Sequence, residues 1–340
     1  MKTAIVILAA GKGSRMKTDL PKVLHKIGGK PLIIHAMDSS SEIKTTQRIV
    51  VVASEAKEIK DTVLEKYPNA KIAIQDPVLG TGHAVEQVRH LISNSDEDIL
   101  VLYADTPFVS GETIKRMQLE RKNSDLVVLG FNNSNSGYYG RLVTKGKSLK
   151  KIVEHKDATP KEKSITLCNS GILLGSSKLI FSCLSKITKE NKADEYYLTD
   201  CIEIAVTQGK KASFITCDQT ETQGVNSKAE LAIAEAFFQE KCRSQHMEQG
   251  VTLVAPETNF FSYDTTIAPG TIIEPNVVFG PNVKIEKDVI IKSFSYLEGT
   301  HILKNSIIGP FARLRGESKL GPNTRVGNFV EIKNSNILKD

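Results

Sequence analysis

Tryptophan is absent from this 340-residue sequence, and aromatic residues make up only 6% of it. Proteins that bind single-stranded nucleic acid commonly stack bases on aromatic side chains in a basic groove. The formal net charge is +6, but residues of both signs are interspersed through most of the chain, without a basic stripe and interleaved aromatics. The sequence therefore argues against a nucleic-acid surface, and small polyphosphates fit its charge better.

Paired cysteine motifs are also missing. The five cysteines are odd in number and scattered, without the spacing of a zinc site: Cys168, Cys183, Cys201, Cys217 and Cys242. No apolar run is long enough to span a bilayer, and the run after Lys2 ends at Ala10 in a basic loop instead of a signal-peptide cleavage site. These features predict a cytoplasmic protein, with no membrane partner.

The length and the 40% hydrophobic content are sufficient for two domains with sizeable cores. Up to about residue 226, apolar strand-like runs alternate with helical segments; the runs are residues 4–8, 48–52, 71–74, 99–103 and 126–131. This alternation predicts an α/β Rossmann-like domain with a mostly parallel sheet, in which ligands bind at the carboxyl ends of the strands. A connecting helix is predicted from residue 227 to about 247.

A glycine-rich basic loop follows the first predicted strand. Residues 8–16 read Leu-Ala-Ala-Gly-Lys-Gly-Ser-Arg-Met, and Leu-Pro-Lys follows at 20–22. Glycines let backbone N–H groups approach an anion closely, and Lys12, Arg15 and Lys22 could neutralise phosphate oxygens. The loop matches neither the dinucleotide fingerprint nor the P-loop. A plain strand-to-helix turn remains an alternative, which the three cations disfavour.

Residues 8–16 and 20–24 resemble the signature of the sugar-1-phosphate nucleotidyltransferases. Over essentially its whole length the chain resembles the bacterial GlmU family, bifunctional enzymes that combine N-acetylglucosamine-1-phosphate uridylyltransferase with glucosamine-1-phosphate acetyltransferase. The resemblance implies transfer of UMP from UTP to N-acetylglucosamine 1-phosphate, with Mg²⁺ as cofactor. The product, UDP-N-acetylglucosamine, would serve the synthesis of peptidoglycan and lipopolysaccharide precursors.

Two further motifs follow predicted strands. Gln75 precedes a Gly80-Thr81-Gly82 turn, and its carboxamide offers a donor and an acceptor to the edge of a pyrimidine base. Asp105 follows the strand at 99–103, where its carboxylate could hold a divalent cation. From the residues alone, the Gly80-Thr81-Gly82 segment could also be an ordinary glycine turn, and Asp105 could also be a turn or helix-capping residue. The resemblance implies that Gln75, Gly80 and Thr81 bind uracil and that Asp105 binds Mg²⁺.

The resemblance also implies the remaining site residues. Asn226, which alone would be interpreted as a helix N-cap, matches the second Mg²⁺ ligand. Ala104 stands where relatives carry glycine, and we expect nucleotide binding to survive this change. We expect His155 to have a structural or neutral role, because a phosphate nucleophile needs no deprotonation. Arg15 and Lys22 are the implied catalytic residues. The implied ligands of UTP and UDP-N-acetylglucosamine are Leu8, Ala9, Ala10, Gly11, Lys22, Gln75, Gly80, Thr81, Tyr103, Asp105, Gly140, Glu154, Asn169, Thr199 and Asn226.

By resemblance, Gly140, Glu154 and Asn169 would hold the sugar phosphate. Without the resemblance, Gly140 and Asn169 could equally well be turn residues, and Glu154 could be a solvent-exposed strand residue. Two rival functions remain. One is a related nucleotidyltransferase for another nucleotide or sugar, such as a glucose-1-phosphate thymidylyl- or adenylyltransferase. The other is a non-catalytic sugar-nucleotide sensor or trimeric scaffold, which the presence of both Asp105 and Asn226 disfavours.

A six-residue repeat fills the C-terminal part. Aliphatic or aromatic residues recur at Ile267, Ile273, Phe279, Ile285, Ile291, Leu297 and Leu303 and, after a one-residue slip, at Ile308, Leu314, Leu320, Val326 and Ile332. This period predicts a left-handed parallel β-helix. We therefore divide the chain into a nucleotidyltransferase domain (1–226), a linker helix (227–250) and a β-helix (251–340) that is a truncated acetyltransferase domain.

In the family, the β-helix forms homotrimers, and a homotrimer is expected here by resemblance. Arg315 and Lys333 match residues that bind the acetyl acceptor, whereas the motif with the catalytic histidine would lie beyond Asp340. We therefore expect this chain to lack acetyltransferase activity.

Overall fold

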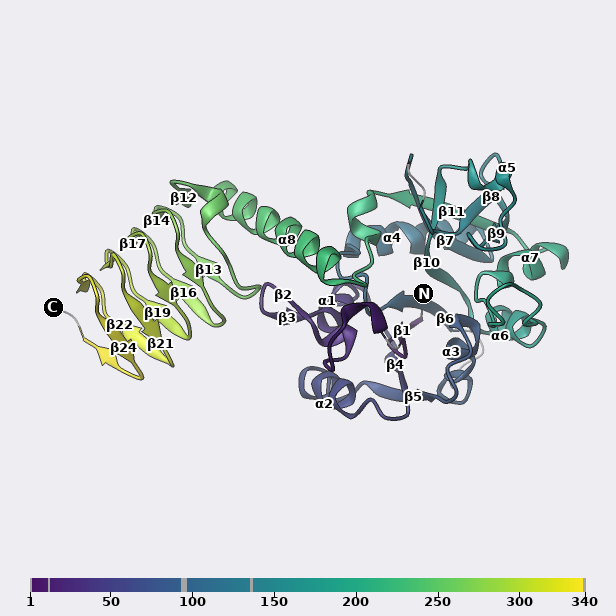
Figure 1. Cartoon of the computed structure of the whole chain (residues 1–340), viewed down its shortest axis with the longest axis horizontal. Coiled ribbons are helices and arrows are strands. Elements are labelled where there is room, and N and C mark those ends of the chain that lie inside the picture. The colour runs from purple at the N-terminus through teal and green to yellow at the C-terminus, as the bar shows by residue number, and fades with distance from the viewer. Residues whose placement is uncertain (1, 12, 93–96, 135–136, 339–340) are drawn as a thin grey trace. The chain divides into compact units, whose positions relative to one another are not determined.

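The computed structural model describes every residue except 1, 12, 93–96, 135–136 and 339–340. The chain divides into two compact units (Figure 1). The first holds residues 1–25 and 31–227, and the second holds residues 26–30 and 228–340. Within the described part, no helix combines the length and the apolar character needed to cross a membrane.

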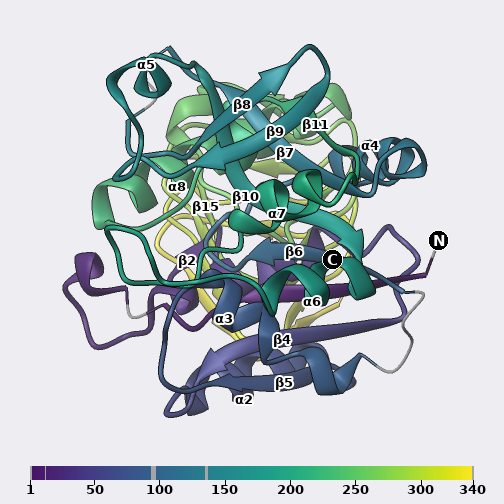
Figure 2. The same cartoon turned by 90° about the vertical axis from the view of Figure 1, so that its right-hand side faces the viewer.

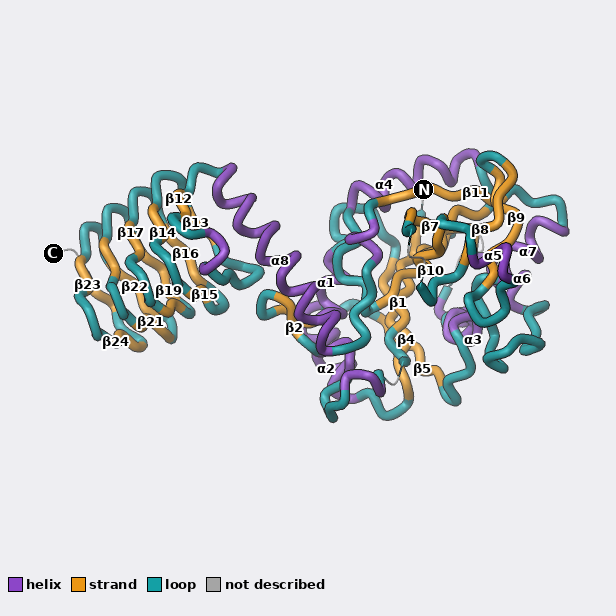
Figure 3. The backbone as a smooth tube through the Cα atoms, turned by 45° about the horizontal axis from the view of Figure 1, so that its top comes forward, coloured by secondary structure: helices purple, strands orange, loops and turns teal. Residues whose placement is uncertain are grey.

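The first unit is built on a nine-stranded sheet with the order β5-β4-β1-β6-β10-β7-β11-β9-β8 (Figure 3). The strands are β1 (Thr3–Leu8), β4 (Gln47–Ala53), β5 (Lys71–Gln75), β6 (Asp98–Tyr103), β7 (Leu126–Asn132), β8 (Arg141–Lys145), β9 (Ser148–Val153), β10 (Leu167–Ser176) and β11 (Ala212–Cys217). β5, β4, β1 and β6 are mutually parallel, as are β7 and β11. β10 lies antiparallel between β6 and β7, and β8 and β9 pair antiparallel. The predicted Rossmann-like fold is confirmed.

Alternate residues of the central strands pack on opposite faces of this sheet. Val6 and Leu8 of β1 share a core with α3, α6 and α7, whereas Ile5 and Ile7 share the other core with α1, α2 and α4. Figure 2 views the first unit from the side of α6 and α7. A strand covered on both faces must be apolar at every position, which explains the unbroken apolar run of residues 4–8.

The helices of the first unit are short. They are α1 (Leu32–Asp38), α2 (Lys57–Lys66), α3 (Thr81–Glu86), α4 (Gly111–Glu120), α5 (Pro160–Lys163), α6 (Ser177–Leu184) and α7 (Asp200–Thr207). Single 3₁₀ turns add η1 (Ser14–Met16), η2 (Lys22–Leu24), η3 (Arg89–Leu91), η4 (Arg121–Asn123) and η5 (Gln219–Thr222).

The second unit contains α8 (Lys228–Glu248) and a parallel β-helix, whose three sheets have the orders β12-β14-β17-β20-β23, β13-β16-β19-β22-β25 and β15-β18-β21-β24. Its strands are β12 (Thr252–Leu253), β13 (Thr266–Ile267), β14 (Ile272–Ile273), β15 (Val278–Phe279), β16 (Val283–Ile285), β17 (Ile290–Ile291), β18 (Tyr296–Leu297), β19 (Thr300–Ile302), β20 (Ile307–Ile308), β21 (Arg313–Arg315), β22 (Ser318–Leu320), β23 (Arg325–Val326), β24 (Glu331–Lys333) and β25 (Asn336–Ile337), with η6 (Pro256–Thr258). Residues 26–30, from the hairpin of β2 (Lys26–Ile27) and β3 (Lys30–Pro31), also belong to this unit. The predicted β-helix is confirmed.

The predicted repeat needs one correction. Ile302, not Leu303, is the fully buried residue of its turn. The slip lies earlier than predicted: Val278 pairs with Tyr296 in one turn, but Tyr296 pairs with Arg313 in the next, which is one residue shorter. The shortened segment is the Glu298-Gly299 turn between β18 and β19. Sequence periodicity placed the slip wrongly because residues 302 and 303 are both aliphatic.

Candidate functional site

A cavity of about 370 Å³ lies at the carboxyl ends of β1, β5 and β6. Its lining consists of Leu8, Ala9, Ala10, Gly11, Lys22, Val23, Gln75, Val78, Gly80, Thr81, Ala84, Tyr103, Asp105 and Glu195. All ten implied nucleotide ligands from Leu8 to Asp105 are in this lining, whereas the predicted phosphate-neutralising residue Arg15 is not. In open α/β sheets, ligands bind at this edge.

A larger hollow, of about 680 Å³, lies at the opposite edge of the same sheet. Lys2, Gln47, Lys71 and Glu97, which stand at or beside the beginnings of strands, help to line it. It contains neither the glycine-rich loop nor the predicted metal ligands. We therefore take the smaller cavity as the functional site.

The glycine-rich loop folds back onto Lys22. Gly13 has a φ of +61°, and a Cβ atom added there would lie 2.5 Å from the Cβ of Lys22. Only glycine accommodates both the left-handed backbone and this close approach. The fold of the loop therefore carries Lys22 into the cavity, while Arg15 lies in η1, exposed and outside the lining. Lys12 lies outside the described residues.

Lys22 joins two residues that are distant in sequence. Its Nζ atom donates to Asp105 Oδ2 at 2.5 Å and to Asn226 Oδ1 at 2.9 Å. The Asn226 segment is held against Asp105 by the backbone, because Val225 N–H donates to the Asp105 carbonyl oxygen at 2.9 Å. A carboxylate oxygen and a carboxamide oxygen thus converge on one cation.

This donor set fits a hard divalent metal. Mg²⁺ prefers oxygen ligands and commonly binds one or two protein groups together with water and substrate phosphates. Asp105 and Asn226 both reach a single ammonium nitrogen, so their oxygens are close enough to share a metal ion. Among the described residues, no group of three or more His, Cys, Asp or Glu side chains could hold a metal. Asp105 and Asn226 would supply two oxygen ligands to such a site.

Gln75 closes the cavity at the end of β5, where only 2% of the residue is exposed. Its Nε2 atom donates to the Gly80 carbonyl oxygen at 2.9 Å and lies 3.2 Å from His83 Nδ1. Gly80 itself has a φ of +106°, and a Cβ atom there would lie 2.7 Å from the Tyr196 carbonyl oxygen. The glycine is therefore required for the approach of this loop to the segment around Tyr196.

The three residues predicted to hold the sugar phosphate, Gly140, Glu154 and Asn169, form a second group with Thr199, another predicted ligand. Thr199 Oγ1 donates to Glu154 Oε1 at 3.1 Å, and Asn169 N–H donates to the Gly140 carbonyl oxygen at 2.8 Å. A Cβ atom on Gly140 would lie 3.2 Å from Glu154 Oε2, so the backbone of residue 140 faces the carboxylate. Burial raises the pKa of the Glu154 carboxyl, and the Thr199 hydroxyl partly offsets this by donating to the carboxylate.

Hydrogen bonds connect the two groups. Leu198 N–H donates to Thr81 Oγ1 at 3.1 Å, and Gly82 N–H donates to the Tyr196 carbonyl oxygen at 2.8 Å. Burial raises the pKa of the Tyr103 phenol, with further contributions from Glu154 of one group and Asp105 of the other. The loop at residues 75–82, called the base loop below because uracil is predicted to bind there, therefore lies beside the predicted sugar residues.

Sequence analysis missed some residues of this site. Glu195 lines the cavity, but its spacing gives no signal for it. Arg141 is buried and donates to the carbonyl oxygens of Tyr139 and Gly137, and its positive charge offsets a small part of the rise that burial causes in the pKa of Glu154. A charged residue directly after Gly140 was the signal that could have found it.

Two residues lie away from the cavity. Ala104 is fully buried in the core that also contains Ile5 and Ile7 of β1, and it is not in the cavity lining. The His155 ring packs edge-on against Tyr138, with ring centroids 5.1 Å apart. Burial, assisted by Lys163 and Arg141, lowers the pKa of His155.

In the second unit, Arg315 of β21 and Lys333 of β24 are neighbours in register. Arg315 Nε donates to Glu331 Oε1 at 2.6 Å, and this contact lowers the pKa of the Glu331 carboxyl. The two predicted acceptor-binding residues are thus side by side on one face of the β-helix.

Comparison with known proteins places the sequence. Residues 5–166 match the MobA-like NTP transferase domain, and residues 264–299 match the bacterial transferase hexapeptide (six repeats). The chain is 47% identical over 337 residues to "Bifunctional protein GlmU" of Roseobacter denitrificans, covering 99% of this chain and 75% of that protein. The protein of the same name from Jannaschia sp. is 45% identical over 336 residues, covering 99% and 74%.

Solved structures share the fold at lower identity. UDP-glucose pyrophosphorylase complexed with UDP-glucose has a TM-score of 0.56 at 20% identity, covering 71% of this chain and 100% of that one. The inositol-1-phosphate CTP transferase from T. maritima has a TM-score of 0.55 at 15% identity, covering 67% and 90%. These likenesses show the nucleotidyltransferase fold.

Proposed function

The chain belongs to the family of the bifunctional GlmU proteins, and from that membership we propose that it transfers UMP from UTP to N-acetylglucosamine 1-phosphate. The products are UDP-N-acetylglucosamine and pyrophosphate, the former serving peptidoglycan and lipopolysaccharide precursors. The chain is a nucleotidyltransferase by family, and such enzymes use a sugar phosphate and a nucleotide with a divalent metal. The proposal adds the identity of the sugar, the base and Mg²⁺.

The observation that carries the proposal is the Lys22–Asp105–Asn226 cluster beside the cavity. It combines a cation for phosphate with two oxygen ligands for a metal, next to a loop that can hold a triphosphate and a carboxamide that can hold a base. Lys22 has a long flexible stem, so we propose that its ammonium group turns to phosphate oxygens when the substrates and the metal bind.

The reaction needs no covalent enzyme intermediate and no general base. A phosphate oxygen of N-acetylglucosamine 1-phosphate forms a bond to the α-phosphorus of UTP while the bond from that phosphorus to the bridging oxygen breaks in line, and pyrophosphate leaves with the electron pair. The protein's part is to position the two phosphates and to balance their charge, by the backbone N–H groups of the glycine loop and by Lys22, with Arg15 assigned the same role. Mg²⁺ held by Asp105 and Asn226 would neutralise charge on the reacting phosphates.

The other end of the site is proposed to hold the sugar. Glu154 and Thr199 are suited to sugar hydroxyls, and Asn169 and the backbone of Gly140 to the N-acetyl group and its neighbours. Tyr103 and Glu195 line the cavity together with the glycine loop, and, in addition to burial, the charges of Glu154 and Glu195 contribute to the raised pKa values of Tyr103 and Glu154, respectively.

The test is release of pyrophosphate from UTP, Mg²⁺ and N-acetylglucosamine 1-phosphate, with CTP, dTTP and ATP, and with glucose 1-phosphate, as competing substrates. We expect UTP with the N-acetyl sugar to be preferred and a chelator to abolish activity. Preference for another nucleotide or sugar would support the related nucleotidyltransferase instead, and inactivity with every pair would support a sensor or scaffold.

Three further features are proposed. The hexapeptide repeats support a homotrimer assembled through the β-helix. The adjacent Arg315 and Lys333 support binding of an amino-sugar phosphate there, to be measured by calorimetric titration with glucosamine 1-phosphate, whereas no acetyl transfer is expected in an assay run beside the first. All five cysteines are free thiols, which supports the cytoplasm as the compartment.

A further inference from the structure

The carboxamide of Gln75 can be oriented from its protein partners alone. Its Nε2 atom lies 2.9 Å from the Gly80 carbonyl oxygen. A backbone carbonyl oxygen accepts hydrogen bonds and never donates them, so it must face the NH₂ end of the carboxamide. The reverse orientation would place two acceptors against each other in a residue that is 2% exposed, where water cannot relieve the mismatch.

This orientation fixes the state of His83. The second N–H of Gln75 Nε2 has His83 Nδ1 at 3.2 Å, so this ring nitrogen must be the acceptor. The ring is then neutral and carries its proton on Nε2. Tyr196, from the segment that is hydrogen-bonded to the base loop, contacts the His83 ring, with centroids 6.3 Å apart.

We propose that His83 is a positioning residue that selects the base by occupying the second N–H of Gln75. With both N–H groups engaged by the protein, Gln75 offers its Oε1 acceptor to the cavity. Uracil presents a donor, N3–H, at the position where cytosine presents an acceptor, so this arrangement favours uracil and opposes cytosine. Thymine also has N3–H and is not distinguished by this contact. The inference rests on the proposed function, because it assumes a base beside Gln75.

His83→Ala is the informative variant. It removes one of the two contacts that hold the NH₂ end of Gln75 away from the base, so the carboxamide turns over more easily and presents an N–H to the N3 acceptor of cytosine. Because one hydrogen bond is typically worth about 0.5–1.5 kcal/mol, we expect the ratio of kcat/KM for UTP to that for CTP to fall about 3- to 10-fold. The change should appear in KM, higher for UTP and lower for CTP, with kcat at saturating nucleotide nearly unchanged, because His83 is not in the lining of the cavity.

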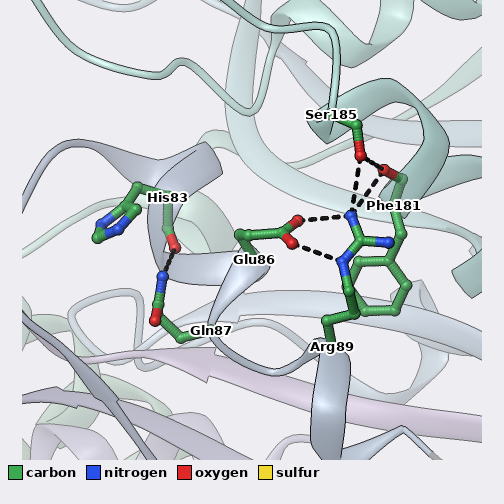
Figure 4. Close-up of polar contacts among 6 residues, drawn as sticks. All are labelled: His83, Glu86, Gln87, Arg89, Phe181 and Ser185. Carbon is green, nitrogen blue, oxygen red and sulfur yellow. Dashed lines mark hydrogen bonds and ion pairs between the residues drawn. The ribbon is translucent and has the colours of Figure 1, made fainter.

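Two other variants control the experiment. His83→Asn keeps an acceptor on the side chain and should restore part of the preference for UTP. Gln87→Ala, one helical turn further on, removes a hydrogen bond from Gln87 Nε2 to the His83 carbonyl oxygen at 3.0 Å but leaves the ring contacts in place (Figure 4). For Gln87→Ala, the ratio of kcat/KM for UTP to that for CTP should equal the wild-type ratio. A change of the same size in Gln87→Ala would show that only the local fold is being disturbed, and would overturn the proposal.

A spectroscopic measurement makes the test independent of mutant folding. In wild-type protein with ¹⁵N-labelled histidine, the His83 signals should report a protonated Nε2 and an unprotonated Nδ1 at neutral pH. The opposite tautomer would overturn the proposal, as would an unchanged UTP-to-CTP ratio in folded His83→Ala. If the wild-type protein does not use UTP at all, the proposed function fails instead, which separates the two hypotheses.

Discussion

Lys22 belongs to the basic sequence motif and also makes the tertiary contacts of the site. It ends the basic loop, begins η2 and links two oxygens that come from far apart in the chain. Its ion pair with Asp105 is largely buried, so the loss of either partner leaves a charge with little water to solvate it. A substitution here therefore affects both the charge in the site and the fold around it.

Replacing Lys22 with Ala should lower kcat/KM for pyrophosphate release by about 10²-fold or more, since a preorganised charge beside the reacting phosphates is lost. The matched control is Lys17→Asn, which removes another basic residue of the same loop, exposed and with a φ of 52° that asparagine tolerates. Steady-state kinetics of both variants would check this. Near-normal turnover by Lys22→Ala would refute its role.

Asp200 illustrates a group that lowers stability at neutral pH. Burial, with Glu154 next in importance, raises the pKa of its carboxyl from 3.8 to about 6. The folded state therefore retains a proton that the unfolded state has lost, so the group's contribution to stability is full below about pH 4 and disappears as pH rises through about 6.

Asp200→Asn should accordingly increase the free energy of unfolding at pH 8 by about 1 kcal/mol, a figure reduced for solvent screening because the group is partly exposed, and should change it little at pH 4. Urea denaturation at the two pH values would measure this. Asp218, whose pKa is lowered by hydrogen bonds from Thr220, is the control, because Asp218→Asn should not be stabilising at pH 8. A stabilisation of Asp200→Asn that is equal at both pH values would contradict the explanation.

At the scale of elements, the hairpin of β2 and β3 depends on one glycine. Gly28 N–H donates to Glu235 Oε2 of α8 at 2.8 Å, and its carbonyl oxygen accepts from Tyr263 N–H at 2.8 Å. It has a φ of +55°, and a Cβ atom there would lie 2.1 Å from the ring of Phe238. The hairpin, α8 and the start of the β-helix therefore pack together only because residue 28 lacks a side chain.

Gly28→Ala should reduce stability by about 2–3 kcal/mol, because the added methyl group combines backbone strain with overlap against an aromatic ring. Gly146→Ala is the matched control: its φ is +59°, but its added Cβ would have no atom within 4 Å, so only strain of about 1 kcal/mol is expected. Thermal melting followed by circular dichroism would compare them. Equal losses in the two variants would show that the Phe238 contact is unimportant.

The contact between η3 and α6 is a second place where one residue holds separate elements together (Figure 4). Arg89 of η3 forms two hydrogen bonds with Glu86 of α3, at 2.5 and 2.8 Å, and reaches across to the Phe181 carbonyl oxygen at 2.9 Å and Ser185 Oγ at 3.1 Å. The guanidinium also lies over the Phe181 ring, 4.6 Å from its centroid. Because α3 begins at Thr81, this contact fixes the helix that follows the base loop.

Arg89→Ala should reduce stability by about 1 kcal/mol, since the guanidinium is partly exposed and its contacts are shared with water. Because α3 would become less well held, KM for UTP should rise more than kcat falls. Arg89→Lys, which keeps the charge but not the fork of donors, should recover only part of both losses. Full recovery by lysine would show that charge alone matters.

The spacing of apolar residues in the sequence predicted the elements well, because each buried strand and each turn of the β-helix needs apolar residues at regular positions. The same logic failed at Leu303, where two adjacent aliphatic residues fit equally well and tertiary register decided in favour of Ile302. It also could not show that Lys22 bridges Asp105 and Asn226, because such contacts depend on how distant loops meet. Glu195 and His83 were missed for the same reason, since neither carries a recognisable spacing.

For the whole molecule, the β-helix presents an apolar column at one corner. Phe294, Phe311 and Phe329 occupy successive turns with φ of 56–61°, and each ring stacks on the next with centroids 5.1 Å apart. Asparagine takes the same backbone conformation at Asn305 and Asn323, where it is better tolerated. Bulky residues with left-handed backbone, stacked in exposed positions, support the proposal that this unit associates with further copies of the chain.

Nucleotidyl transfer should nevertheless be independent of that association. All residues that we place at the nucleotide and sugar ends of the site come from the first unit of a single chain, so no partner is needed to complete it. Over a dilution series in which light scattering reports a falling mass, we expect the specific activity of pyrophosphate release to stay constant. A parallel decline of pyrophosphate release with mass would mean that assembly shapes the first unit, and the site would then have to be reconsidered as a property of the oligomer.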